Sequence, residues 1–175
     1  MREWMRDVQI RDPLFGDLPL AQWSGDSLED RHAEPWRSFR LAKQQRAQRD
    51  DQAAKATLHE ILLTPNLESR HYLQAWHFLR GLGEQPAPEQ AKHIYGVVIE
   101  VALQEGLEIV AAYEDRSARY FNYSGAGVVW EHPDASLDEN VEALLAAGRN
   151  VVAQIGPWTA SVRPHPLRVK RALTC

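Results

Sequence analysis

The residues best suited to chemistry lie in one short stretch, residues 117–131, which reads SARYFNYSGAGVVWE. The stretch is rich in aromatic side chains but contains Asn122 and Ser124, and asparagine is unfavourable inside a strand. In a strand, alternation would place Tyr120, Asn122 and Ser124 on one face and Arg119 on the other. The polar aromatic face would suit a small pocket or a docking surface, with Arg119 as an anchor for an anion. The candidate ligand- or partner-binding residues are Arg119, Tyr120, Asn122, Tyr123, Ser124, Trp130 and Glu131.

The same stretch also has a purely structural interpretation. Asn122 would bond the backbone at the rim of a sheet, and the glycines after it would serve turns and close packing. The Ser-Gly-Ala-Gly run lacks the lysine of a phosphate-binding loop. No glycine lies two residues before Ser124, as a nucleophile elbow requires. The sequence therefore assigns no catalytic residue and favours a protein that is not an enzyme, with an enzyme kept as an alternative.

A second candidate site is a block of basic side chains without any acidic residue between positions 37 and 49. Its members are Arg37, Arg40, Lys43, Arg46 and Arg49. Each step of three residues turns a helix by about 300°, so these side chains spiral over the surface and form no narrow stripe. The block is a candidate for nucleic-acid binding. However, residues 50–162 carry sixteen acidic and seven basic side chains and can neutralise it, so nucleic acid is the less favoured partner.

The spacing of histidines and acids does not support a metal site. His71 and His77 lie six residues apart, about 240° around a helix, and would face different directions. The remaining histidines lie in unrelated segments, and adjacent acid pairs lie where turns and helix starts favour them. We therefore predict no metal site and no cofactor.

The composition is that of one ordinary globular domain. The chain has 175 residues, of which 44% are hydrophobic and 25% charged. It contains no apolar run of about 18 residues, and the first twenty residues have no apolar core of a secretion signal. The only cysteine is Cys175, so no disulfide can form within the chain. These features predict a cytoplasmic protein without a membrane span.

The first half of the chain predicts an arm followed by helices. Residues 1–34 show neither strand nor helix periodicity and predict an extended N-terminal arm that packs on the body or on a partner. Helix formers run unbroken from residue 35 to 63, where Thr64 and Pro65 would end one helix and begin the next. The second helix would end at the glycines at 81 and 83. Residues 35–83 are therefore expected to form a helical hairpin.

Period-two alternation begins near residue 94 and predicts a sheet. The expected strands are residues 94–103, 107–114, 118–124 and 128–131, which together form a β-meander over residues 94–131. A buried acid, Glu100, would pair with Arg119 or Arg70. Residues 158–162 alternate like a short fifth strand, and residues 163–175 would form a flexible basic tail.

A long helix should follow the meander. Ser136 with Glu139 has the spacing of a capping box, and the apolar stripe over residues 137–155 would cover one sheet face. The predicted fold class is α+β, with an N-terminal helical hairpin, an antiparallel four- to five-stranded β-meander and a long C-terminal helix packed on the sheet. These elements would form a single domain over residues 35–162. The second sheet face would be covered by the helical hairpin or serve as a protein interface.

Three segments of the chain resemble a group of bacterial proteins of unassigned activity. They are residues 72–80 (YLQAWHFLR), 110–131 and 155–158, and the stretch from 72 to 158 that contains them covers roughly half of the chain. The resemblance implies a stand-alone bacterial cytosolic protein. It implies no activity, cofactor or site residue.

These observations lead to three hypotheses about function. The first is a non-enzymatic protein-binding module, such as an adaptor, accessory or immunity-type protein, that docks a protein partner or a second copy through its sheet. The second is a small-molecule sensor or enzyme with a pocket at Tyr120, Asn122 and Ser124. The third is nucleic-acid binding through the helix that carries the basic block. The absence of a catalytic constellation favours the first.

Overall fold

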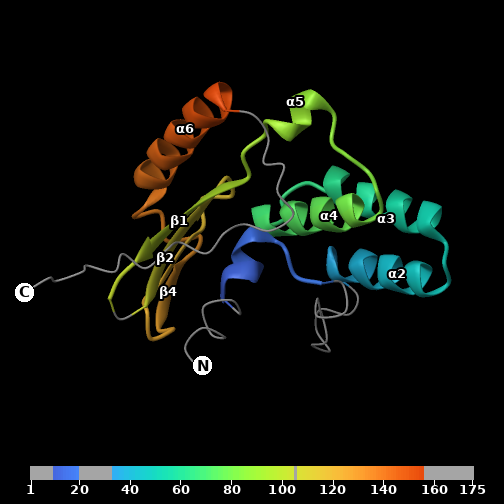
Figure 1. The fold of residues 1–175 in the computed structure, drawn as a ribbon, viewed down its shortest axis with the longest axis horizontal. Coiled ribbons are helices and arrows are strands. Elements are labelled where there is room, and N and C mark those ends of the chain that lie inside the picture. The colour runs from blue at the N-terminus through green and yellow to red at the C-terminus, as the bar shows by residue number, and fades with distance from the viewer. Residues whose placement is uncertain (1–9, 20–32, 105, 156–175) are drawn as a thin grey trace, which may run out of the picture. The chain divides into compact units, whose positions relative to one another are not determined.

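The computed structural model describes residues 10–19, 33–104 and 106–155 (Figure 1). Its internal contacts divide the chain into two compact units. The helical unit comprises residues 12–91, and the sheet unit comprises residues 1–11 and 92–175. The boundary after residue 91 lies within residues 35–162, for which the sequence predicts a single domain. It falls just after a proline-containing stretch in which most side chains are exposed and little packing holds the chain.

Between residues 36 and 81 the helical unit contains three helices where the sequence predicts two. They are α2 (Trp36–Ala47), α3 (Asp51–Leu63) and α4 (Ser69–Gly81), followed by the single turn α5 (Pro88–Ala91). The predicted first helix is interrupted because Arg49 adopts a left-handed backbone conformation with φ 62°. The carboxylate of Asp50 then accepts a hydrogen bond from the N–H of Ala53 at 3.0 Å and caps α3.

The last of these helices begins later than predicted. Thr64 adopts an extended conformation at the end of α3, and Asn66 turns the chain with φ 61°. The hydroxyl of Tyr72 donates to the carbonyl of Thr64 at 2.7 Å and fixes this turn. The Thr64–Pro65 pair therefore closes α3 and does not start α4, which begins at Ser69.

An aromatic and aliphatic core holds the helical unit together. Its buried members include Phe39, Leu58, Ile61, Phe78 and Leu79. The rings of Phe39 on α2 and Phe78 on α4 meet edge to face at nearly perpendicular planes, with centroids 5.8 Å apart. Trp36 meets the ring of His71 in the same way at 5.1 Å. The first turn of α2 therefore contacts α4 both near its start, at His71, and near its end, at Phe78.

The N-terminal arm is partly helical where the structure describes it. Residues 10–15 form a helical segment, so the expectation of extended chain is wrong there. Within the helical unit, the side-chain amide of Gln74 donates to the carbonyl of Leu18 at 2.8 Å, and this bond holds the chain that follows the helical segment against α4. A local hydrogen-bonded turn replaces the predicted coil because the Asp17 N–H donates to the Asp12 carbonyl at 2.9 Å. The rest of the predicted arm lies outside the described residues.

The sheet unit contains a four-stranded antiparallel sheet whose strands follow sequence order (Figure 1). The strands are β1 (Gly96–Ala102), β2 (Leu107–Tyr113), β3 (Ala118–Phe121) and β4 (Gly127–Trp130). The predicted meander is confirmed, with β1 and β4 at the two edges. At the first turn, the Leu103 N–H donates to the Gly106 carbonyl at 2.8 Å.

Helix α6 (Asp138–Gln154) packs on one face of this sheet and contacts β1 and β2, as the sequence predicts (Figure 1). Its Val141 and Leu145 are buried in a cluster with Ala112 and Ala118. Small alanines on the strands let the helix approach closely. The helix therefore anchors on one end of the sheet face.

The predicted capping box before α6 is wrong. The helix follows Leu137 without a side-chain cap. The N–H of Ser136 instead donates to the carboxylate of Asp134 at 2.9 Å, which forms a local turn. Hydrogen bonding from Ser136 also lowers the pKa of Asp134.

The opposite face of the sheet is buried at Ile109, Ala111 and Tyr113. Glu100 on this face pairs with Arg11, whose Nη2 lies 3.0 Å from Oε2 of the glutamate. The prediction that Glu100 pairs with Arg119 or Arg70 is therefore wrong. The sequence could not have identified this partner because 89 residues separate the two side chains.

The end of the chain contributes two further predictions, a fifth strand over residues 158–162 and a basic tail over residues 163–175. Both lie outside the described residues. In the ranges that the structure describes, no helix has the length and apolar character needed to cross a bilayer.

Candidate functional site

The predicted polar aromatic stretch folds as β3, β4 and the turn between them. Pairing with β2 places Arg119 opposite Ala111 and Tyr120 opposite Val110, so the two side chains lie on opposite faces of the sheet. Trp130 shares the face of Tyr120 because it lies opposite Ala118. The structure therefore does not bring Arg119 and Tyr120 into one pocket.

Asn122 and Ser124 build the turn between these strands. The Oδ1 atom of Asn122 accepts hydrogen bonds from the Ser124 N–H at 3.0 Å, the Ser124 hydroxyl at 2.8 Å and the Ala126 N–H at 3.0 Å. Three donors occupy this oxygen, as in the structural interpretation of the sequence. Tyr123 extends from the turn and is exposed. The arrangement explains Asn122 without a ligand.

Arg119 and Glu131 form an ion pair on the buried face. Nη2 of Arg119 lies 2.9 Å from Oε1 of Glu131, and Nη1 lies 3.3 Å from the hydroxyl of Ser117. The guanidinium carbon lies 5.6 Å from the centre of the Tyr113 ring. These contacts satisfy a buried charge with groups of its own unit, so they serve structure.

Tyr120 lies on the face that carries α6 and hydrogen-bonds the carboxylate of Glu108. Desolvation raises the pKa of the Tyr120 hydroxyl, and the negative charge of Glu108 and the hydrogen bond to it raise this pKa further. Tyr120 therefore keeps its proton in the folded protein and remains a hydrogen-bond donor.

Two rows of side chains cross this face of the sheet, one beside the other. We call the first the covered row, because α6 packs against it; it consists of Val97, Ala112, Ala118 and Trp130. The second, two residues along each strand, we call the open row; it consists of Ile99, Val110, Tyr120 and Val128. Four strands thus contribute one side chain each to either row.

The open row is apolar and exposed. Ile99, Val110 and Val128 expose 41%, 38% and 50% of their surface, and Tyr120 is half-buried. Next to them on β1, Val101 is 47% exposed. Contiguous exposed apolar side chains are unusual on a free surface and mark interaction sites. The open row is therefore the strongest candidate site in the described part of the chain.

Most of the open row is not predicted from the sequence. Of its four members, only Tyr120 is predicted as a site residue, because the pattern of the three aliphatic residues is typical of an ordinary strand interior. Alternation does place Ile99, Val110 and Val128 on one face. What it cannot show is which row the following helix covers, and that decides which row stays exposed.

The basic block lies on α2 and the turn after it. Arg37 pairs with Glu34 at 2.6 Å, and Arg46 pairs with Asp51 at 3.2 Å. Lys43 is exposed, Arg40 is half-buried, and Arg49 lies in the left-handed turn beyond the helix. Arg37 and Arg46 thus have acidic partners within the helical unit, and the block forms no continuous basic face on α2.

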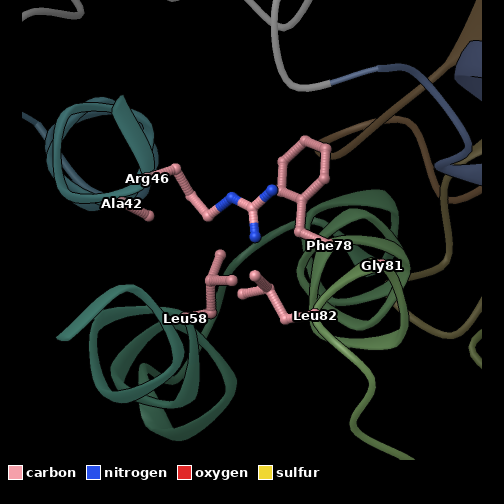
Figure 2. Close-up of a pocket in the computed structure, with 6 residues that line it drawn as sticks. All are labelled: Ala42, Arg46, Leu58, Phe78, Gly81 and Leu82. Carbon is pink, nitrogen blue, oxygen red and sulfur yellow. The ribbon is translucent and has the colours of Figure 1, made fainter. Parts of the chain in front are cut away.

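A small apolar pocket lies where α2, α3 and α4 meet (Figure 2). It is lined by Ala42, Arg46, Leu58, Phe78, Gly81 and Leu82 and has a volume of about 160 Å³. Figure 2 shows the Arg46 side chain reaching across the space towards Phe78. The volume is that of one benzene-sized group. Because Asp51 holds the Arg46 guanidinium, the pocket offers a ligand an apolar wall and one shared charge.

Comparison with known proteins assigns the chain to no family. No protein-family model matches it, and searches of curated proteins and of solved structures find no match either. Among the described residues, no three histidine, cysteine, aspartate or glutamate side chains are grouped so that they could hold a metal ion. The geometry of the open row alone thus marks it as the candidate site.

Proposed function

We propose that this protein is a protein-binding module that docks a partner protein on the open row of its sheet. The observation that carries the proposal is the position of this row, which continues the covered row on the same face and yet leaves Ile99 and Val128 exposed. Burial of apolar surface is the main favourable term in protein association. A partner that covers the row would complete the layer that α6 begins.

The two alternative functions have weaker support. A pocket at Tyr120, Asn122 and Ser124 would need the Asn122 oxygen, which already accepts three hydrogen bonds from its own turn. Nucleic-acid binding would need a continuous basic face, and Arg37 and Arg46 are paired with acids. The chain has a single cysteine and can form no disulfide within itself, which favours the cytoplasm as the place of the interaction.

Photo-crosslinking tests the proposal. Val128 and Val129 are neighbours on β4, are similarly exposed at 50% and 48%, and lie on opposite faces of the sheet. A photoreactive amino acid at position 128, introduced in native host cells, is expected to capture a specific partner that position 129 does not capture. The purified partner should then bind the full chain and lose affinity for a Val110→Asp variant.

Two outcomes would contradict the proposal. Equal capture at positions 128 and 129 would show that the open row has no special role. Capture of only a second copy of this chain would make the row a homodimer interface and would rule out a separate partner. Circular dichroism of each variant establishes that the fold is retained.

A further inference from the structure

We infer that the occupant of the open row is an amphipathic helix of the partner, with basic residues beside its apolar stripe, which lies next to α6 on the same sheet face. The inference rests on the proposed function. It adds the kind of partner, which is argued from the shape of the row, its spacing and its charge.

The exposed surface is a face of side chains. A partner strand would bind at an edge, along β1 or β4, and would extend the sheet by backbone hydrogen bonds. Such a strand would leave the central members of the row, Val110 and Tyr120, as exposed as before. A helix laid on the face would bury them, because its apolar stripe presents a continuous surface.

The dimensions of the row suit a short helix. Four strands spaced about 4.8 Å apart give a row about 14 Å wide. A helix rises about 1.5 Å per residue, so about ten residues, or three turns, span the row. The open row lies two residues along the strands from the covered row, a distance of about 6.7 Å. Neighbouring helices pack about 8 to 10 Å apart. A second helix next to α6 would therefore rest on Ile99 and reach Val101.

The charge around the row favours a basic partner. Glu108 on β2 lies opposite Val101 on β1, on the sheet face that carries the open row. Both side chains lie two residues along their strands from the open row. Residues 92–155 carry ten acidic and four basic side chains. Three of these basic side chains already have acidic partners, in the pairs Arg116–Asp138, Arg119–Glu131 and Arg149–Glu142. Glu108 beside the row, together with the excess of acids over residues 92–155, would attract and orient a helix that carries lysine or arginine.

Model peptides test the inference on the full chain. The probe is an 18-residue peptide of leucine and lysine with the leucines on one helical stripe. The controls are a peptide of the same composition in scrambled order and a leucine and glutamate peptide with the same stripe. Binding is measured by fluorescence anisotropy at physiological salt, and the binding surface is mapped by amide chemical shifts.

We expect the striped lysine peptide to bind at least about tenfold more tightly than either control, which corresponds to about 1.4 kcal/mol. Val128→Asp should weaken this binding about tenfold, and the matched Val129→Asp should leave it within twofold. Glu108→Lys should reduce the preference for the lysine peptide over the glutamate peptide. Shifted amides should cluster at Ile99, Val110 and Tyr120.

Equal binding of the striped and scrambled lysine peptides would overturn the inference, as would equal loss in the Val128 and Val129 variants. Val128→Thr, which keeps the shape of valine, replaces the aspartate variant if that one does not fold. A native partner that crosslinks at position 128 while the striped peptide does not bind would refute the helix and keep the docking function. Peptide binding without any crosslinked partner would show that the row can hold such a helix, but it would refute the docking function and with it the inferred partner.

Discussion

Arg119 and Glu131 share an ion pair but differ greatly in their exposure to solvent. Nη2 of Arg119 and Oε1 of Glu131 lie 2.9 Å apart, and the two side chains are 7% and 54% exposed. The pair thus connects a buried cation on β3 with a carboxylate that water can reach. The contribution of this pair to the free energy of unfolding lies between that of a buried ion pair and that of a surface ion pair, because solvent still screens the glutamate.

Glu131→Gln is expected to lower the free energy of unfolding by about 1 kcal/mol, because it removes the charged partner of a buried guanidinium. Urea denaturation measures the change. The matched control is Glu142→Gln, which breaks the pair between Arg149 and Glu142, where both side chains are about half exposed. This control should change stability by less than about 0.5 kcal/mol. Equal effects would show that the burial of Arg119 adds nothing to its ion pair.

Asn122→Ala should destabilise the sheet unit by about 1 to 2 kcal/mol, because three donors lose their shared acceptor. Asn122→Asp keeps an oxygen in the same place and should restore most of that loss. The measurement is again urea denaturation, with crosslinking at position 128 as a second readout. Loss of the crosslink in both variants, at unchanged stability, would instead assign Asn122 to the docking site.

The sequence predicted well those features that depend on local patterns. Period-two alternation gave the four strands, and the apolar stripe placed α6 on the sheet. The break between α2 and α3 was missed because Arg49 is neither glycine nor proline and still adopts a left-handed conformation. The pairing of Arg11 with Glu100 was missed because it depends on tertiary structure.

The exposure of the open row likewise depends on tertiary structure and could not be predicted from local sequence patterns. Alternation identifies Ile99 and Val110 as sharing a face, but their exposure depends on where α6 comes to rest. Small side chains at Ala112 and Ala118 set that position, and no local rule relates them to the row beside them. Tyr120 was predicted as a site residue for its polarity, and the structure places it among aliphatic residues instead.

Two helix glycines should respond to alanine in opposite directions. A Cβ atom at Gly81 would meet no atom within 4 Å, whereas one at Gly148 would lie 2.7 Å from Cγ2 of Val97. Gly81→Ala should therefore stabilise the protein by about 0.5 kcal/mol through lower chain entropy in the unfolded state. Gly148→Ala should destabilise it by about 1 to 3 kcal/mol, because α6 must move away from β1. Stabilisation by both substitutions would show that α6 packs less closely than described.

Asp50→Ala should lower the free energy of unfolding by about 1 kcal/mol, because the Ala53 N–H loses its acceptor at the start of α3. Ser136→Ala is the matched comparison, since the sequence marks Ser136 as a helix cap and α6 has no side-chain cap. Ser136→Ala should lower the free energy of unfolding clearly less than Asp50→Ala does. A larger loss for Ser136→Ala would restore the capping box that the structure rejects.

Tyr120 should titrate above its ordinary pKa of 10.0, because desolvation and the nearby charge of Glu108 both disfavour the tyrosinate. The folded protein then binds this proton more tightly than the unfolded chain. The stabilisation linked to Tyr120 is therefore complete below pH 10 and is lost as the pH rises through the pKa of the folded state. Glu108→Gln should lower that pKa, because it removes the negative charge while keeping a hydrogen-bond acceptor. The difference between the ultraviolet titrations of the parent and a Tyr120→Phe variant isolates this hydroxyl from the other four tyrosines. An unchanged pKa in Glu108→Gln would show that desolvation alone holds the proton, and Glu108 would then be free to meet a basic partner without involving Tyr120.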